Sequence, residues 1–227
     1  MNSEKTNQFL IHDAINAGNT LLAKKLIDEN PNELYKKDDD GRTALHIACS
    51  LNNPDLVAYI VSKTPKGLDI DEYTDDSGWT ALHVTSAVGN AGIFNQLMHL
   101  DPQPDVNLAT GTGTTCLHIA IGKNNYEIVK ELVETYKANC RAKDKRGLTP
   151  LHRAAAIGSQ PIVKLLVEKG KVNINAKEAD GLTPLDEALS EGHGDVGVLL
   201  VKLGADPVVN KDLHVDEKVA NFFKDNI

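Results

Sequence analysis

Gly147-Leu148-Thr149-Pro150-Leu151-His152 is one of five versions of a six-residue stretch that recurs along this chain. The others are Gly41-Arg42-Thr43-Ala44-Leu45-His46, Gly78-Trp79-Thr80-Ala81-Leu82-His83, Gly113-Thr114-Thr115-Cys116-Leu117-His118 and Gly181-Leu182-Thr183-Pro184-Leu185-Asp186. Their opening glycines are separated by 37, 35, 34 and 34 residues. A motif that returns at so constant a spacing indicates a chain built from one repeated supersecondary unit.

Each stretch predicts a turn followed by a short helix. Glycine tolerates a tight turn that a residue with a Cβ atom resists, and the threonine two positions later can cap a helix with its hydroxyl. The leucine and the alanine three residues after it, such as Leu45 and Ala48, fall on one helix face. A second amphipathic helix follows, as in residues 126–133, after a Gly or Asn that can end the first.

The spacing and the motif together resemble the ankyrin repeat, whose signature is T-P-L-H-x-A. We therefore predict an all-α repeat solenoid of ankyrin repeats, each a helix-turn-helix plus a hairpin finger. Six full repeats and a truncated C-terminal seventh would form a single ankyrin-repeat domain over residues 1–227. The predicted repeats span residues 6–38, 39–75, 76–110, 111–144, 145–178 and 179–211, with a helical cap in 212–227.

Charge is distributed unevenly along the chain. The net formal charge is −8, and up to residue 113 there are 16 Asp and Glu against 8 Lys and Arg. From residue 114 onward the two signs balance. Acidic residues gather just before the early glycines, as in residues 38–40 and 69–76, and basic residues gather in 137–153. Clusters at one recurring point of the repeat favour an electrostatically polarised binding face.

The sequence contains no catalytic or metal-binding constellation, so we expect neither an enzyme nor a cofactor. No nucleophile motif and no phosphate-binding glycine loop is present. The lack of a CxxC pair indicates free thiols, and Cys49 and Cys116 are expected to be buried and inert. At one position of the repeat a neutral imidazole can bridge the capping threonine and the neighbouring unit, which favours a structural role over metal binding. The histidines there are His12, His46, His83, His118 and His152.

Neither a membrane nor a nucleic acid is an expected partner. The opening residues, Met1 to Gln8, lack the apolar stretch of a signal peptide, and no run of 18 apolar residues could span a bilayer. A nucleic-acid binder could use the basic residues in 137–153. The net acidity and the lack of aromatic side chains for base stacking argue against that alternative.

The expected binding surface consists of the finger tips and the inner side of the first helices. Trp79, the only tryptophan, is either an aromatic anchor for a partner or packs on the preceding connector near Tyr73. Ile47, Arg153 and Glu187 are expected to line the concave side, and a charge at position 153 has no evident structural use. The predicted protein-binding residues are Asp39, Asp40, Arg42, Asp75, Asp76, Trp79, Lys143, Lys145, Arg146 and Arg153.

Several strings in the chain resemble the gankyrin family within the ankyrin class, and together they extend over essentially the whole length. They are Asp75-Asp76-Ser77-Gly78-Trp79-Thr80, residues 143–159, Glu191-Gly192-His193-Gly194-Asp195 and residues 219–227 with Phe222-Phe223.

The resemblance implies a non-catalytic chaperone for assembly of the proteasome regulatory particle. It implies that the concave face binds the C-terminal domain of one AAA-ATPase subunit of the base through complementary charges. Such binding would block premature docking of the ATPase. We expect a monomer in the cytoplasm and nucleus. The alternative is a generic ankyrin-repeat signalling scaffold or a kinase-inhibitor-like binding protein.

Overall fold

The computed structural model describes residues 10–227, in which every named element is a helix and one isolated β-bridge joins Ala109 to Thr115. The predicted all-α repeat fold is therefore confirmed. The segment from Met1 to Gln8, and with it the predicted start of the first repeat at residue 6, lies outside the described residues. The chain divides into two compact units, one ending at Asp105 and the other beginning at Val106.

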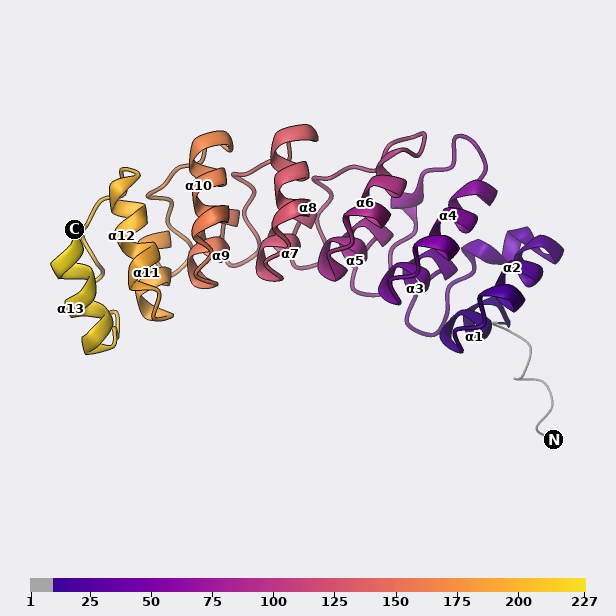
Figure 1. Ribbon diagram of the computed structural model, residues 1–227, viewed down its shortest axis with the longest axis horizontal. Helices are drawn as coiled ribbons and strands as arrows, with labels where there is room; N and C mark the ends of the chain where they lie inside the picture. The colour runs from indigo at the N-terminus through magenta and orange to yellow at the C-terminus, as the bar shows by residue number, and fades with distance from the viewer. Residues whose placement is uncertain (1–9) are drawn as a thin grey trace. The chain divides into compact units, whose positions relative to one another are not determined.

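Unit 1 is built from three pairs of helices within residues 10–105 (Figure 1). The first helices pack on one another, α1 on α3 and α3 on α5, and the second helices do the same, α2 on α4 and α4 on α6. Short 3₁₀ helices lie in two of the connectors. The elements are α1 (Leu10–Asn16), α2 (Thr20–Glu29), η1 (Pro31–Tyr35), α3 (Ala44–Ser50), α4 (Pro54–Lys63), η2 (Ile70–Glu72), α5 (Ala81–Val88) and α6 (Ala91–Met98).

Unit 2 continues the same pattern with three more pairs and a last single helix in residues 106–227 (Figure 1). Helix α7 packs on α9 and α9 on α11, while α8 packs on α10 and α10 on α12. One second helix ends in a wider π turn, η3. The elements are α7 (Cys116–Gly122), α8 (Tyr126–Lys130), η3 (Glu131–Thr135), α9 (Pro150–Ala156), α10 (Gln160–Lys169), α11 (Pro184–Ser190), α12 (Gly194–Lys202) and α13 (Glu217–Asn226).

The core of each unit lies where the paired helices meet. The alanines that follow the signature leucine by three residues leave no exposed surface, and their small side chains let neighbouring helices approach closely. They are Ala48, Ala120, Ala154 and Ala188. At the C-terminal end, α13 packs on α12 and buries Phe223, so this helix caps the last pair. Phe222, which the sequence also assigned to the cap, keeps 47% of its surface exposed.

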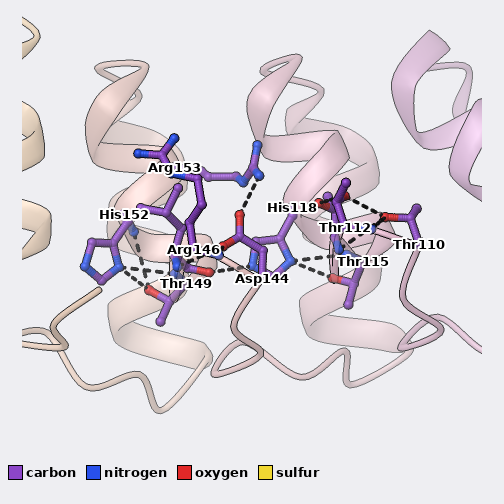
Figure 2. A network of polar contacts seen from close by, with 11 residues as sticks. Thr110, Thr112, Thr115, His118, Asp144, Arg146, Thr149, His152 and Arg153 are labelled. Atoms are coloured by element: carbon purple, nitrogen blue, oxygen red, sulfur yellow. Dashed lines mark hydrogen bonds and ion pairs between the residues drawn. The ribbon is translucent and has the colours of Figure 1, made fainter. Parts of the chain in front are cut away.

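Four signature histidines, His12, His46, His118 and His152, connect their first helix to the finger of the next repeat within their unit. In His118, Nδ1 accepts a hydrogen bond from the Thr115 N–H at 3.3 Å and lies 2.9 Å from the Thr115 hydroxyl. On the other side of the ring, Nε2 donates to the carbonyl oxygen of Leu148 at 3.2 Å. Figure 2 shows this arrangement for His118 beside the equivalent His152. The predicted bridge is confirmed for His46, His118 and His152.

Such a ring is neutral, because Nδ1 accepts the hydrogen bond from the backbone N–H and therefore carries no proton of its own. Burial, together with the positive charge of Arg153, lowers the pKa of His118 to about 4. Burial also lowers the pKa of His46 and His152. All three imidazoles therefore remain uncharged at neutral pH and serve as one-donor, one-acceptor links.

Each signature glycine has a positive φ, and at some of them the next finger approaches closely. At Gly147 φ is 80°, and a Cβ atom would lie 3.1 Å from the Ala179 nitrogen. At Gly181 φ is 83°, and no atom lies within 4 Å of that position. Adjacent finger tips are joined by backbone hydrogen bonds, such as Ala179 N–H to the Arg146 carbonyl at 3.0 Å. Glycine is therefore needed for conformation at both sites and for space at Gly147 alone.

Substituting the two glycines should separate these effects. Gly181→Ala should lower the free energy of unfolding by about 1 kcal/mol, the cost of a left-handed alanine. Gly147→Ala should lower it by at least about 2 kcal/mol, because the methyl group also collides with the next finger. Urea denaturation of both variants measures the difference. Equal decreases in the free energy of unfolding would show that the close approach of the fingers at Gly147 does not affect stability.

The buried imidazoles make folding sensitive to mild acid. The unfolded chain protonates His118 near its ordinary pKa of 6.5, whereas the folded protein does so only near 4. Stability is therefore fully present above pH 6.5 and declines as the pH falls toward 4, with a loss of about 2 kcal/mol by pH 5 from this residue. Denaturation at pH 7 and pH 5 tests this, with His118→Asn expected to show the smaller decline. A wild-type stability that is flat over this range would contradict it.

Candidate functional site

The finger turns are held by a side-chain acceptor three residues before each signature glycine. In the fourth finger, Asp144 Oδ1 accepts from the N–H groups of Arg146 at 2.9 Å and Leu148 at 3.0 Å. The same pair of hydrogen bonds recurs in the other four fingers with an Asp, a Thr or a Glu as acceptor. The acceptors are Asp38, Asp75, Thr110, Asp144 and Glu178.

This turn device was not predicted, although the sequence carries its signal. Asp occurs three residues before Gly41, Gly78 and Gly147, a regularity independent of overall acidity. Asp75, predicted as a partner contact, holds its own finger, because its Oδ1 accepts from Ser77 N–H and Trp79 N–H, both at 2.8 Å. Part of the early acidic cluster is therefore structural.

The structure places the predicted binding residues in two groups according to exposure. Six have exposed side chains and lie at or beside the finger tips; they are Asp39, Asp40, Asp76, Lys143, Lys145 and Arg146. Four are half-buried; they are Arg42, Asp75, Trp79 and Arg153. The exposed group is acidic in unit 1 and basic in unit 2. The charge polarity of the fingers therefore lies on accessible side chains.

In unit 1 the guanidinium of Arg42 pairs with two carboxylates of its own finger. It lies 2.9 Å from Asp38 and 2.8 Å from Asp40. Within residues 10–105, the carboxylates of Asp39 and Asp76 have no hydrogen-bond or ion-pair partner, and both are exposed. These two side chains carry negative charge that the unit itself does not neutralise.

Trp79 is half-buried, and its ring lies beside a signature histidine. The ring centroids of Trp79 and His83 are 6.2 Å apart. Its backbone is fixed on both sides, by Asp75 at the N–H and by the His46 ring at the carbonyl. Tyr73, the alternative neighbour proposed from the sequence, instead pairs with Tyr35 at a centroid distance of 5.2 Å.

The charge at position 153 has a structural use, contrary to the expectation from sequence. Arg153 reaches from α9 to Asp144, with Nη2 2.8 Å from Oδ2 (Figure 2). Burial opposes ionisation of Asp144, but hydrogen bonds from Arg153 and from two backbone N–H groups outweigh it and hold the pKa of this carboxyl below its usual range. Arg153 therefore ties its first helix to its own finger while 31% of its side chain stays exposed.

The next repeat presents the opposite charge at the position of Arg153. Glu178 braces the last finger, and its second oxygen, Oε2, is buried without a hydrogen-bond partner in the described residues. Burial and the charge of Glu178 raise the pKa of Glu187, which stands at the position of Arg153 one repeat later. A cationic repeat bearing Arg146 and Arg153 thus lies beside an anionic one in unit 2.

In the second repeat, the position equivalent to Arg153 is Ile47, and it is not accessible to a partner. Ile47 was predicted to line the concave side, but it is only 2% exposed. Its apolar counterpart Ile119 is 7% exposed. Aliphatic side chains at this position pack against the adjoining helices, because burying them removes apolar surface from water. Only the charged versions, Arg153 and Glu187, retain intermediate exposure in unit 2.

Metal ligands and thiols are the candidate reactive groups of the described residues. No cluster of three or more His, Cys, Asp or Glu positioned to hold a metal ion occurs among residues 10–227. All three cysteines are buried, as expected for two of them, and burial raises the pKa of Cys49 to about 12 and that of Cys140 to about 11. Over the same residues, no helix has the length and apolar character required to cross a bilayer.

Comparison with known proteins supports the repeat interpretation. The family described as ankyrin repeats (3 copies) matches residues 10–109, 85–177 and 117–211. The solved ankyrin repeat domain of Bcl-3 superposes with a TM-score of 0.76 at 25% identity, covering 95% of this chain and 97% of that one. Ankyrin-repeat proteins are generally binding scaffolds.

Two fungal proteins are similar in sequence. One, from Saccharomyces cerevisiae, bears the name probable 26S proteasome regulatory subunit p28; it is 39% identical over 61% of this chain and 60% of its own length. The other, an ankyrin repeat-containing protein of Schizosaccharomyces pombe, is 41% identical over 55% of this chain and 52% of its own length. The chain thus matches a little over half of each relative. The first of them confirms the resemblance to proteasome-associated ankyrin proteins.

Removing a turn acceptor should be more damaging than removing an exposed tip charge. Asp144→Ala should lower the free energy of unfolding by about 2–3 kcal/mol, because it leaves two backbone N–H groups and Arg153 without their acceptor. Lys145→Ala, one residue away and exposed, should change it by less than about 0.5 kcal/mol. Chemical denaturation compares them, and similar losses for both variants would rule out the bracing role of Asp144.

Proposed function

This chain belongs to the ankyrin-repeat family, and from that premise we propose that it is a non-catalytic chaperone for assembly of the proteasome regulatory particle. In this proposal it binds the C-terminal domain of one AAA-ATPase subunit of the base, using the finger tips and the exposed residues of the first helices. Its bulk would block premature docking of that subunit. We propose that it acts as a monomer in the cytoplasm and nucleus.

The proposal draws first on sequence similarity. The relative from Saccharomyces cerevisiae is named as a probable proteasome regulatory subunit, and the shared region covers 61% of this chain. The strings that resemble the gankyrin family, residues 143–159 among them, include the fourth finger and α9. They also include Arg153 and the basic tip.

The observation that carries the proposal is the exposure of charged tips on a backbone that is already fixed. The side chains of four tip residues make none of the hydrogen bonds that shape their turns. They are Asp39 and Asp76 in unit 1 and Lys145 and Arg146 in unit 2. The turns are held by Asp38, Asp75 and Asp144. A partner would therefore meet preorganised charges, which reduces the ordering cost of association.

The chemistry of these tips defines a complementary partner. Basic side chains of the partner would face the fingers of unit 1, and acidic side chains would face the fourth finger of unit 2. Exposed charges of this kind chiefly raise the rate and specificity of association. Trp79, half-buried beside His83, is the aromatic side chain proposed to add affinity.

Calorimetric titration of this protein with the C-terminal domain of each proteasomal AAA-ATPase subunit tests the proposal. We expect one-to-one, salt-sensitive binding to a single subunit. Asp39→Lys combined with Asp76→Lys, and separately Lys145→Glu combined with Arg146→Glu, should each weaken binding at least tenfold. Neither pair uses a side chain that holds its turn, so folding should be preserved.

The matched control is Lys164→Glu combined with Lys169→Glu, which makes the same charge change on exposed positions of α10. It should bind as the wild type does. Failure of the wild-type protein to bind any ATPase domain would instead favour a generic signalling scaffold or kinase-inhibitor-like protein. That alternative has one observation in its favour: 35% identity over 65 residues to protein phosphatase 1 regulatory subunit 27 of Mus musculus.

A further inference from the structure

A pocket of about 180 Å³ opens between two successive connectors of unit 2. One wall comes from the connector before Gly147, with Arg141 and Lys143, and the opposite wall comes from the connector before Gly181, with Lys177. One water molecule takes up about 30 Å³ in the liquid, so the space could hold a polar group of several atoms. No carboxylate lines it.

Two hydrogen bonds across the pocket hold its cations in place. Arg141 donates from Nε to the Lys171 carbonyl at 2.6 Å, so both Nη nitrogens are left for another acceptor. Lys143 donates from Nζ to the Lys177 carbonyl at 2.9 Å and keeps two further donor hydrogens. Arg141 and Lys143 are thus each bound to the opposite connector by one contact and have spare donors.

The positive charge of this pocket is not neutralised by the protein. None of Arg141, Lys143 and Lys177 forms an ion pair within residues 106–227. The two nearest acids along the chain hold their own turns: Asp144 also pairs with Arg153, and Glu178 binds the last finger through Oε1. Neither acid forms an ion pair with a cationic residue of the pocket.

The corresponding space in unit 1 shows that the opening is a departure from the repeat. There the tilted rings of Tyr35 and Tyr73 pack against each other across the same gap, and only about 10 Å³ remains. Tyr35 stands six residues before Gly41, as Arg141 does before Gly147, and Tyr73 stands five before Gly78, as Ala176 does before Gly181. In unit 2, Arg141 and Ala176 stand in place of the two tyrosines. The smaller alanine side chain opens the cavity, and the guanidinium adds positive charge to it.

We propose that this pocket binds a phosphorylated side chain, a phosphoserine or phosphothreonine, of a protein partner. A phosphate monoester brings about two negative charges and three strong acceptor oxygens to a site with three cations. The free edge of the Arg141 guanidinium can contact two of those oxygens at once, the geometry for which arginine is suited. The pocket lies behind the fingers, at the connectors, so it adds a second recognition point to the surface already described.

The shape of the site favours a single phosphoryl group over a nucleic acid. Its cationic residues line one small cavity, and no aromatic side chain lines it for base stacking. A carboxylate, with one charge and two oxygens, would use fewer of the available donors.

Nuclear magnetic resonance titration of the full chain with acetyl-Gly-Gly-phosphoSer-Gly-Gly-amide tests the proposal, at about 0.15 M salt to screen diffuse attraction. We expect saturable shifts confined to residues 140–143 and 172–177. The Glu version of the peptide and inorganic phosphate should each bind at least tenfold more weakly. Equal affinity for inorganic phosphate, or tighter binding of an oligothymidine, would overturn the assignment.

One double variant and a matched control distinguish binding in the pocket from attraction to general positive charge. Arg141→Gln combined with Lys143→Gln should weaken phosphopeptide binding at least tenfold. Lys145→Gln combined with Arg146→Gln removes the same charge from the exposed finger tip and should change it less than twofold. Equal weakening by both pairs would overturn the proposal.

Ala176→Tyr provides a test that leaves the charges in place. Since Tyr73 occupies the same repeat position in unit 1, a tyrosine there should fill the pocket and abolish the saturable shifts. Undiminished binding by this folded variant would also overturn the proposal. The assays contain no ATPase domain, so their outcome is independent of the function proposed above.

Discussion

The repeat depends on one hydrogen-bonded link, the neutral histidine ring between a capping threonine and the backbone of the next finger. Because Nε2 donates to a carbonyl in the following repeat, as in His118 to Leu148, the ring fixes both the start of its own helix and the position of its neighbour. The link requires a dry, uncharged imidazole, which the packed helices on either side supply. Helix packing and finger placement therefore stabilise each other.

The sixth repeat shows the logic of this link by departing from it. There Asp186 replaces histidine, and its Oδ2 accepts from Thr183 N–H at 2.9 Å and from the Thr183 hydroxyl at 2.8 Å. No further signature finger follows with a carbonyl to receive a donor. Instead Oδ1 accepts from Asn210 N–H at 2.8 Å. A carboxylate, which can only accept, suits a position where the following chain offers an N–H group.

The sequence predicts the features that repeat and fails where a residue's role depends on its neighbours. The helix pairs, the capping threonines and the bridging histidines follow from spacing, since each repeat supplies independent support for the same assignment. The exposure of Ile47 and the purpose of Arg153 were both predicted wrongly. The exposure of Ile47 depends on how closely the adjoining helices cover it. The role of Arg153 depends on Asp144, a carboxylate nine residues earlier whose orientation is set by its turn. The connector pocket depends on side chains from two repeats and has no signature of its own.

Successive fingers are joined by main-chain atoms, as in Asp76 N–H to the Asp40 carbonyl and Ala179 N–H to the Arg146 carbonyl. Every amino acid except proline has such an N–H group. The side chains at these tips can consequently drift during evolution without loosening the stack. A lineage could acquire a new partner by rewriting tip residues one at a time on an unchanged scaffold, with proline alone forbidden at the donor positions.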